Sequence, residues 1–342
     1  MPTRPWLNVL LSTLLLAGPP AATIAATPPP VDAQAVINAL TKANAAVVGV
    51  RVTAAEGARS AETLGKQRMG SGVVIGPDGL ILTIGYLMME AQTIQVVTQD
   101  QRTIPAQPVA YDIATGFGLI RSLLPLRGIA PVSLGSHRDL GTGDMVMAAV
   151  GGSDADVAMT QLVSKRPFSG YWEYHIDTAL FTSPPIANHS GAPLFNQRGE
   201  LLGIGSLFVG DVTGQNRRMP GNMFVPVDLL KPILAELQQT GSSKQSHRPW
   251  LGVTSAEHGG RVQVMRVSKD SPAQSAGLGS GDVVLAVDGA KVTTLEEFYR
   301  KVWAHANPDD EISLTVLQGA DVKTLTLRGV DRMTTMVKPS GI

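Results

Sequence analysis

The chain has 342 residues, enough for two domains that each bury a core. Lysine plus arginine and aspartate plus glutamate both number 28, so the formal net charge is zero and no nucleic-acid partner is indicated. Cysteine is absent, which excludes a thiol nucleophile and disulfides and disfavours zinc, so we expect no metal and no cofactor. The 36 glycines and 23 prolines are typical of a turn-rich β protein.

Residues 1–26 have the pattern of a secretory signal peptide. Arg4 precedes an apolar run from Trp6 to Ala17, and small residues follow as far as Ala26. The alternative is an uncleaved membrane anchor, but the apolar run is shorter than the roughly 20 residues that a span needs. We therefore expect cleavage near Ala25 or Ala26, no stable membrane span afterwards, and an exported protein, periplasmic or extracellular.

Residues 34–238 are predicted to form one mainly β domain. A helix is expected over 36–42, a first strand over 45–52, a flexible loop over 54–68 and a closing helix over 229–238. Between them, short apolar runs recur with turns at the spacing typical of small antiparallel barrels. The expected strands cover 72–75, 80–83, 93–97, 105–111, 118–120, 132–134, 145–150, 157–162, 174–177, 192–195 and 201–208.

A polar stretch of small residues, 239–247, is predicted to be a flexible linker. The second domain, 248–331, mixes helices and strands. Ser271 and Pro272 are the cap and first residue of one helix, and Thr294 caps another that reaches Ala306. A strand over 281–289 and a hairpin of 311–317 with 322–327 complete this α+β unit.

Ser190 lies between small residues on a tight loop before an apolar strand, the setting in which a nucleophilic hydroxyl is presented. With the blocks 70–83 and 223–230, the loop 188–194 resembles the trypsin-like domain of HtrA (DegP/DegQ-type) serine proteases. The sequence Gly277-Leu278-x-x-Gly281-Asp282 is similar to the PDZ domain that follows it in that family. The resemblance implies a trypsin-like double β-barrel, each barrel six-stranded, followed by a PDZ domain.

Two of the three catalytic positions of that family are changed. The family places its histidine in Thr-Asn-x-His-Val, where this chain has Tyr86, and its aspartate in Asp-x-x-Thr-Asp-Leu-Ala, where this chain has Gly116. Ser190 keeps the nucleophile position. Asn188 replaces the glycine whose N–H contributes to the oxyanion hole, and because asparagine tolerates a positive φ we expect the hole to keep its shape.

No shift of the alignment restores the base, because none of the six histidines lies in the first barrel: His137, His175, His189, His247, His258 and His305. A phenol with a pKa near ~10 is protonated at neutral pH and accepts the serine proton poorly. Asp112, four residues before Gly116, would have no imidazole to orient. His175 and His189 are interpreted as solvent-facing or hydrogen-bonded histidines, and a metal site formed by them with Asp177 has no support from ligand spacing.

The resemblance also implies a peptide site in the second domain, where backbone N–H groups of a loop hold a terminal carboxylate and the peptide adds as a strand. Trp250, Leu251, Gly252 and Val253 match that loop, and Gly252 permits close backbone approach. The pocket for the last side chain is assigned to Leu251, Val253, Phe298 and Val302; the alternative is that these are ordinary core residues.

Three functions remain open from the sequence. The first is an exported HtrA-like homologue without protease activity that binds peptides or unfolded proteins by their C-termini, in protein quality control or as a regulator. The second is an active serine endopeptidase that uses Ser190 with a non-standard base. The third is a regulatory subunit in mixed oligomers with an active paralogue. The resemblance separately implies a homotrimer, the usual assembly of the family.

Overall fold

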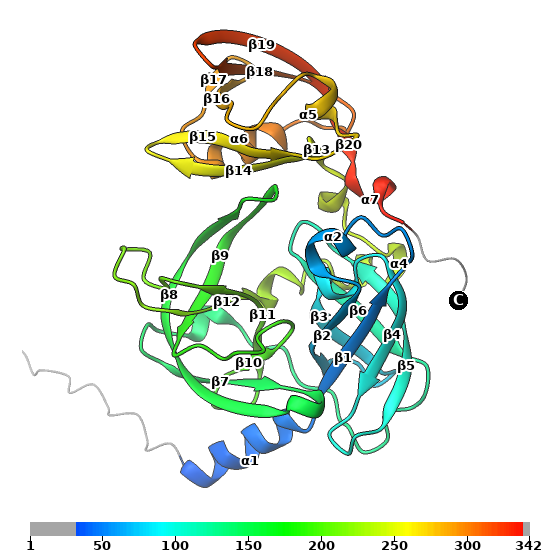
Figure 1. The fold of residues 1–342 in the computed structure, drawn as a ribbon. Helices are drawn as coiled ribbons and strands as arrows, with labels where there is room; N and C mark the ends of the chain where they lie inside the picture. The colour runs from blue at the N-terminus through cyan, green and yellow to red at the C-terminus, as the bar shows by residue number, and fades with distance from the viewer. Residues whose placement is uncertain (1–31, 338–342) are drawn as a thin grey trace, which may run out of the picture.

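The computed structural model describes residues 32–337, so the predicted signal peptide at 1–26 lies outside the described residues. Two β-barrels and a separate β-sheet follow one another along the chain (Figure 1). None of the helices between residues 32 and 337 combines the length and the apolar character needed to cross a bilayer.

The first barrel closes in the strand order β1-β2-β3-β6-β5-β4. Helix α1 (Ala33–Asn44) precedes it, and the carboxylate of Asp32 caps that helix by accepting the N–H of Gln34. The short helices α2 (Ala61–Leu64) and α3 (Gly85–Met88) interrupt the strands. The strands are β1 (Val47–Ala54), β2 (Gln67–Val74), β3 (Leu80–Ile84), β4 (Ala91–Val97), β5 (Thr103–Tyr111) and β6 (Phe117–Ser122).

The second barrel also has six strands, in the order β10-β11-β12-β9-β8-β7, as expected from the resemblance. Its strands are β7 (Met145–Val150), β8 (Asp156–Gly170), β9 (Tyr174–Ser183), β10 (Pro193–Phe195), β11 (Leu201–Val209) and β12 (Gly221–Pro226). The short 3-10 turns η1 (His137–Asp139) and η2 (Gly152–Asp154) flank β7. The strand expected at 132–134 is wrong: only an isolated bridge joins Leu134 to Leu201.

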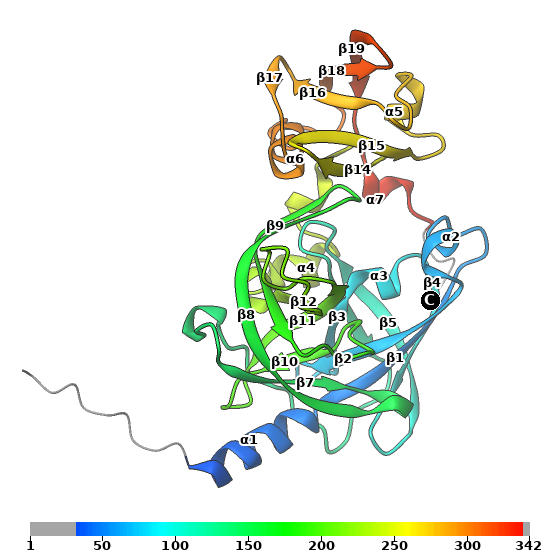
Figure 2. The ribbon, with the colours of Figure 1, turned by 60° about the vertical axis from the view of Figure 1, so that its left-hand side comes forward.

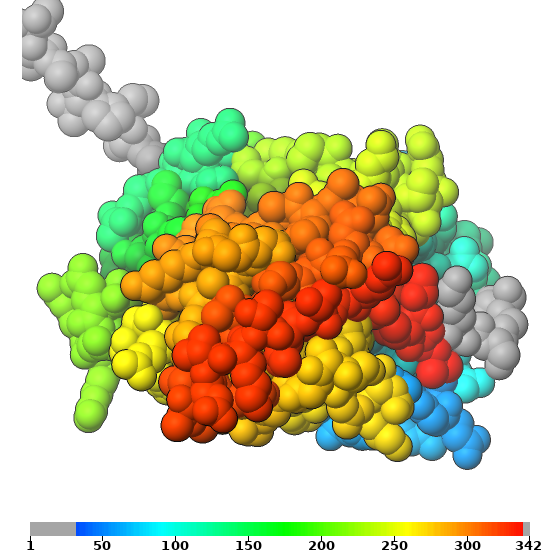
Figure 3. Space-filling view, turned by 90° about the horizontal axis from the view of Figure 1, so that it is seen from above, coloured from blue at the N-terminus to red at the C-terminus, as the bar shows by residue number. Residues whose placement is uncertain are grey.

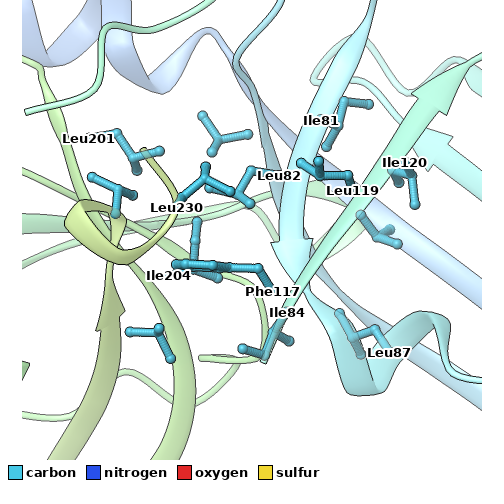
Figure 4. Packing of buried hydrophobic residues seen from close by; sticks show 14 of the residues in the cluster. Ile81, Leu82, Ile84, Leu87, Phe117, Leu119, Ile120, Leu201, Ile204 and Leu230 are labelled. Carbon is cyan, nitrogen blue, oxygen red and sulfur yellow. The ribbon is translucent and has the colours of Figure 1, made fainter. Parts of the chain in front are cut away.

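One continuous apolar core joins the two barrels. Figure 4 shows Leu82 and Phe117 of the first barrel facing Ile204 and Leu230 of the second. All four side chains are fully or almost fully buried. Burial of such side chains stabilises each by about 1.5–3 kcal/mol, so the barrels are held as one unit and the cleft between them is fixed.

The loop at 54–68 is not the flexible segment that its composition indicated. It contains α2, and the buried guanidinium of Arg68 ties it down by donating to Ser60 Oγ at 2.8 Å and to the carbonyl oxygen of Tyr86 at 3.1 Å. The carboxylate of Glu90 accepts the N–H of Ser60 at 2.8 Å. Contacts with Tyr86 and Glu90, which lie beyond the loop, therefore order it, which its own weak pattern could not indicate.

The helix expected over 229–238 is broken. The chain forms a 3-10 turn, η3 (Val227–Leu229), and only then helix α4 (Leu234–Thr240). Pro232 lies between them and has no N–H to continue the ladder of helical hydrogen bonds. Gly241 ends α4 with a left-handed φ of 82°.

The prediction of a flexible linker over residues 239–247 is also wrong. Ser242, Ser243 and Ser246 are buried, and residues Lys244–His247 form the turn η4. The hydroxyls of Ser243 and Ser246 both donate to the carboxylate of Asp112 in the first barrel. Polar residues that look like a solvated linker in the sequence are thus packed against the barrel.

The C-terminal unit contains a sheet in the order β14-β15-β16-β18-β19. As expected, Ser271 caps α5 (Pro272–Ser275) and Thr294 caps α6, but α6 ends at Val302, four residues before the predicted end. The remaining elements are β13 (Pro249–Trp250), β14 (Val253–His258), β15 (Arg261–Val267), β16 (Val283–Val287), β17 (Ala290–Lys291), α6 (Leu295–Val302), β18 (Glu311–Gln318), β19 (Asp321–Arg328), β20 (Val330–Asp331) and α7 (Arg332–Thr335).

This unit sits over the barrels on the side to which the β8–β9 hairpin extends (Figure 2). Seen from that side, its atoms, coloured from yellow to red, cover much of the barrels beneath (Figure 3). The hairpin contacts both α6 and β14, so the two parts of the chain meet directly as well as through residues 239–247.

Candidate functional site

The loop that carries Ser190 is pinned between two strands. The N–H of Ser71 on β2 donates to the carbonyl oxygen of Ser190 at 2.8 Å, and the N–H of Gly191 donates to Gly205 on β11 at 2.8 Å. A Cβ atom at Gly70 would lie 2.5 Å from the Ser190 carbonyl oxygen. Position 70 therefore requires glycine, because the backbone of the Ser190 loop lies too close to leave room for a side chain. This contact connects the sequence block at 70–83 with the loop that carries Ser190.

Tyr86 faces Ser190. It lies on helix α3, which begins where strand β3 ends, and its hydroxyl oxygen is 2.7 Å from Oγ of Ser190. The same hydroxyl donates to the carbonyl oxygen of Ser206 at 2.9 Å. A carbonyl oxygen carries no proton, so while the single phenolic proton points to Ser206, the Ser190 hydroxyl donates to Tyr86.

The chemistry of this contact follows from the state of the phenol. Burial raises the pKa of Tyr86 to about 12, and the hydrogen bond with Ser190 offsets only part of that effect. The phenol is therefore neutral across the physiological range. A neutral phenol orients the Ser190 hydroxyl without taking its proton.

Gly116 lies beside the start of the Tyr86 helix, because its carbonyl oxygen accepts the N–H of Gly85 at 2.7 Å. Its φ is 85°, in the left-handed region that favours glycine. The hydroxyl of Tyr174 would be 3.5 Å from a Cβ at this position, and it already donates to the carbonyl oxygen of Thr115 at 2.6 Å. The structure therefore brings positions 86 and 116 together, but no carboxylate side chain extends from position 116.

Asp112 has a different role from a catalytic carboxylate. It is fully buried, and its Oδ2 accepts the N–H of Thr115 at 2.9 Å as well as the Thr115 hydroxyl. Its Oδ1 accepts the hydroxyls of Ser243 and Ser246. With both oxygens occupied, this side chain is fixed in place and joins the first barrel to residues 239–247.

The two histidines considered as rival bases make other contacts. Nδ1 of His189 lies 3.1 Å from the carbonyl oxygen of Ala187, and burial lowers the pKa of His189. His175 lies between Ser169 and Asp177 on the β8–β9 hairpin, at 2.9 Å and 3.1 Å. Within residues 32–337 no histidine hydrogen-bonds to Ser190, and no cluster of three or more potential metal ligands occurs.

Asn188 is exposed, and the residue of its loop with a positive φ is Gly191, at 75°. The expectation that the loop relies on the tolerance of asparagine for a positive φ is therefore wrong. Asn188 and Ser190 both line a pocket of about 290 Å³. A larger cavity of about 780 Å³, lined by Tyr86, His189 and Trp250 among others, lies between the barrels and the C-terminal unit.

In the C-terminal unit, the N–H groups of the loop expected to bind a carboxylate converge on a carboxylate of this same chain. Glu173, between β8 and β9, accepts the N–H groups of Leu251 at 2.9 Å, Gly252 at 2.7 Å and Val253 at 2.8 Å. A Cβ at Gly252, whose φ is 84°, would lie 2.2 Å from the Ser271 side chain. Only glycine therefore fits this turn without displacing its neighbour.

The apolar residues assigned to the peptide pocket, Leu251, Val253, Phe298 and Val302, are all buried in one cluster with the rest of the C-terminal core. Trp250 is partly buried and lines the larger cavity. Sequence reasoning missed Glu173 completely. A glutamate at a hairpin turn is ordinary in a sequence, and its carboxylate contacts residues 78 or more positions away.

Comparison with known families gives two matches, in separate parts of the chain. The trypsin-like peptidase domain family matches residues 70–204, and the PDZ domain family matches residues 249–328. A probable periplasmic serine endoprotease of the DegP-like type from Halomonas elongata is 28% identical over 280 residues, which cover 77% of this chain and 56% of that protein. The chain thus spans little more than half the length of such DegP-like relatives.

The serine endoprotease DegS of Haemophilus influenzae is 26% identical over 296 residues, which cover 82% of this chain and 83% of DegS. Among solved structures, the HtrA-type protease AlgW with a tripeptide has a TM-score of 0.53 at 23% identity, covering 86% of this chain and 96% of AlgW. The serine endoprotease from Yersinia pestis has a TM-score of 0.52 at 22% identity, with the same coverage of each chain. These structural matches establish the shared fold.

Proposed function

We propose that this chain, which belongs to the HtrA/DegP-like family of trypsin-like proteins with a PDZ domain, binds peptides through that domain and does not cleave them. The observation that carries the loss of proteolysis is the 2.7 Å contact between Tyr86 Oη and Ser190 Oγ. The group opposite the serine is a buried phenol instead of an imidazole.

A trypsin-like mechanism needs three groups to act together: the serine attacks, the imidazole takes its proton, and a carboxylate orients the imidazole. Here Ser190 has a neutral phenol as its partner, and position 116 has no side chain. In a comparable protease triad, removal of the base alone lowers turnover by about a millionfold. Ser190 should therefore behave as an ordinary alcohol.

A fluorophosphonate probe tests this directly, because it reacts with activated serines only. We expect no labelling of the full chain and no cleavage of unfolded casein above the level of a Ser190→Ala control. An active HtrA-type protease, treated in parallel, shows that the reagents work. Labelling or cleavage that Ser190→Ala abolishes would instead make the chain a serine endopeptidase with a non-standard base.

Support for peptide binding comes from the loop 251–253. Its three successive N–H groups surround a carboxylate, and it runs into strand β14, to which a peptide can add as a further strand. A peptide with a free C-terminal carboxylate fits this chemistry. The expected ligands are C-termini of unfolded or damaged proteins, in protein quality control or in regulation.

Matched peptides provide the test. We expect fluorescence anisotropy to detect binding of a labelled peptide that ends in an aliphatic residue with a free carboxylate, and binding at least tenfold weaker when that terminus is amidated, since charge-assisted hydrogen bonds are lost (~1.4 kcal/mol per factor of ten). Equal affinity of the two peptides would exclude recognition of a terminal carboxylate.

We also propose that the protein is exported. Residues 1–26 have the pattern of a signal peptide, and DegP-like relatives are named as periplasmic. Fractionation of cells that produce the full chain, with mass spectrometry of its N-terminus, checks both export and cleavage. A cytoplasmic protein that retains Met1 would contradict this proposal.

A further inference from the structure

The β8–β9 hairpin ends in a short turn, Tyr171 to Glu173, that points at the PDZ domain (Figure 2). Glu173 is only 5% exposed although it lies at the tip of a hairpin. Its two carboxylate oxygens accept all three N–H groups of Leu251, Gly252 and Val253. Its own domain provides none of these donors, so the partner of this carboxylate is the neighbouring domain.

The backbone of the turn continues the contact along the PDZ sheet. The carbonyl oxygen of Tyr171 accepts the N–H of Ser255 on β14 at 2.9 Å. Tyr171 precedes Glu173 by two residues, and Ser255 follows Val253 by two. The turn therefore presents a carboxylate to the loop and a backbone carbonyl to the strand at the spacing of a short extended peptide.

Helix α6 of the PDZ domain also contacts the hairpin. The hydroxyl of Tyr299 donates to the carbonyl oxygen of Gly170 at 2.8 Å, and Arg300 pairs with Asp177 on β9. Arg248 also reaches the turn, with a long contact of 3.5 Å to the carbonyl oxygen of Glu173. The hairpin thus lies against the loop, the strand and the helix that would surround a bound peptide.

Glu173 also has an unusual backbone. Its φ is 59°, a left-handed conformation that glutamate rarely adopts and that carries an energetic penalty. Burial raises the pKa of its carboxyl group, while the three N–H donors act in the opposite direction. The hydrogen bonds from the loop 251–253 offset the cost of burying this carboxylate at the tip of the hairpin.

We propose that the β8–β9 hairpin is an internal ligand of the PDZ domain: Glu173 occupies the three N–H groups that an incoming C-terminal carboxylate needs, so a peptide binds only after displacing the hairpin. This inference rests on the proposed peptide-binding function and adds its regulation. Because residues 171–174 also line the cavity of about 780 Å³ between the domains, the same displacement changes the wall of that cavity and couples peptide binding to the barrels.

The apparent affinity for a peptide is reduced by the fraction of molecules whose site is open. Replacing Glu173 by alanine removes the internal carboxylate, and we expect the full-length variant to bind the free-carboxylate peptide about tenfold more tightly than the wild type. Glu173→Gln keeps the size of the side chain but loses its charge, so it should lie between the two. Asp156→Asn, an exposed position at the other end of β8, is the matched control and should leave the affinity unchanged.

Amide hydrogen exchange in the full chain without peptide provides a second, independent measurement. The amides of Leu251, Gly252 and Val253 should exchange at least about tenfold faster in Glu173→Ala and faster in Glu173→Gln, but at the wild-type rate in Asp156→Asn. Unchanged affinity, or unchanged exchange in both Glu173 variants, would overturn the inference.

If no variant binds any peptide, the proposed peptide-binding function fails, and the exchange rates alone decide whether Glu173 occupies the loop. If Glu173→Ala does not fold, Glu173→Gln decides.

Discussion

The hydroxyl of Tyr86 and the hydroxyl of Ser190 lie 2.7 Å apart across the cleft between the two barrels, although 104 residues separate them in the chain. The contact has the distance of a nucleophile and its base, but the second group is a phenol that burial keeps neutral up to a pKa of about 12. The group within hydrogen-bonding distance of the Ser190 hydroxyl is thus a neutral phenol.

Replacing Tyr86 by phenylalanine tests whether the phenol acts structurally. The carbonyl oxygen of Ser206 loses its donor, so we expect a destabilisation of about 1–2 kcal/mol and no change in casein cleavage relative to the wild type. Urea unfolding and a casein assay measure the two effects. If cleavage were present in the wild type and lost in this variant, Tyr86 would be acting as the base.

Glycine is expected to be required at position 116 because of its backbone conformation. Because its φ is 85°, Gly116→Ala should destabilise the protein by about 1–2 kcal/mol, although the nearest atom to the new Cβ is 3.5 Å away. Gly210→Ala is the control, since position 210 has neither a positive φ nor an atom within 4 Å of its Cβ. Equal midpoints of thermal unfolding for the two variants would contradict this explanation.

Asp112 should be among the most sensitive polar positions of the barrels. Asp112→Ala leaves Ser243, Ser246 and Thr115 without their buried acceptor, and we expect a loss of about 3 kcal/mol in the free energy of unfolding. Asp139→Ala, an exposed aspartate, should change it by less than about 0.5 kcal/mol. A loss below about 1 kcal/mol for Asp112→Ala would show that the contact with residues 239–247 is dispensable.

Asp228 is expected to make the free energy of unfolding decrease as the pH becomes acidic. Burial by itself would raise the pKa of Asp228, but hydrogen bonds from the His137 N–H, the Ser136 hydroxyl and the His137 ring lower it to about 2, from 3.8. A lowered folded-state pKa contributes stability above the unfolded value of 3.8, which is lost as the pH falls from about 4 to about 2.

The size of this contribution is about 2 kcal/mol near neutral pH, and Asp228→Asn should remove it. Urea unfolding curves between pH 2 and pH 7 measure the difference, which should disappear at the acid end. A wild type and variant that differ by the same amount at every pH would show that the effect of the substitution is not electrostatic.

Local pattern accounts for the parts of the fold that were predicted correctly. The spacing of short apolar runs indicated most strands of both barrels, although β12 was not predicted, and the caps Ser271 and Thr294 indicated the starts of α5 and α6. The errors arose where distant residues decide the local structure. Residues 239–247 and the loop at 54–68 look flexible by composition, yet buried partners outside them, such as Asp112 and Glu90, order them.

By itself, the sequence indicated a resemblance to a protease family and placed Tyr86 and Gly116 where that family has two catalytic residues, because these inferences depend on which residue types stand in which motif. Only the tertiary structure decided that the phenol of Tyr86 meets Ser190, that Asp112 holds residues 243–246, and that Glu173 accepts the N–H groups of residues 251–253. Each of these contacts joins side chains far apart in the chain, and such a pairing exists only after the barrels and the C-terminal sheet have packed together.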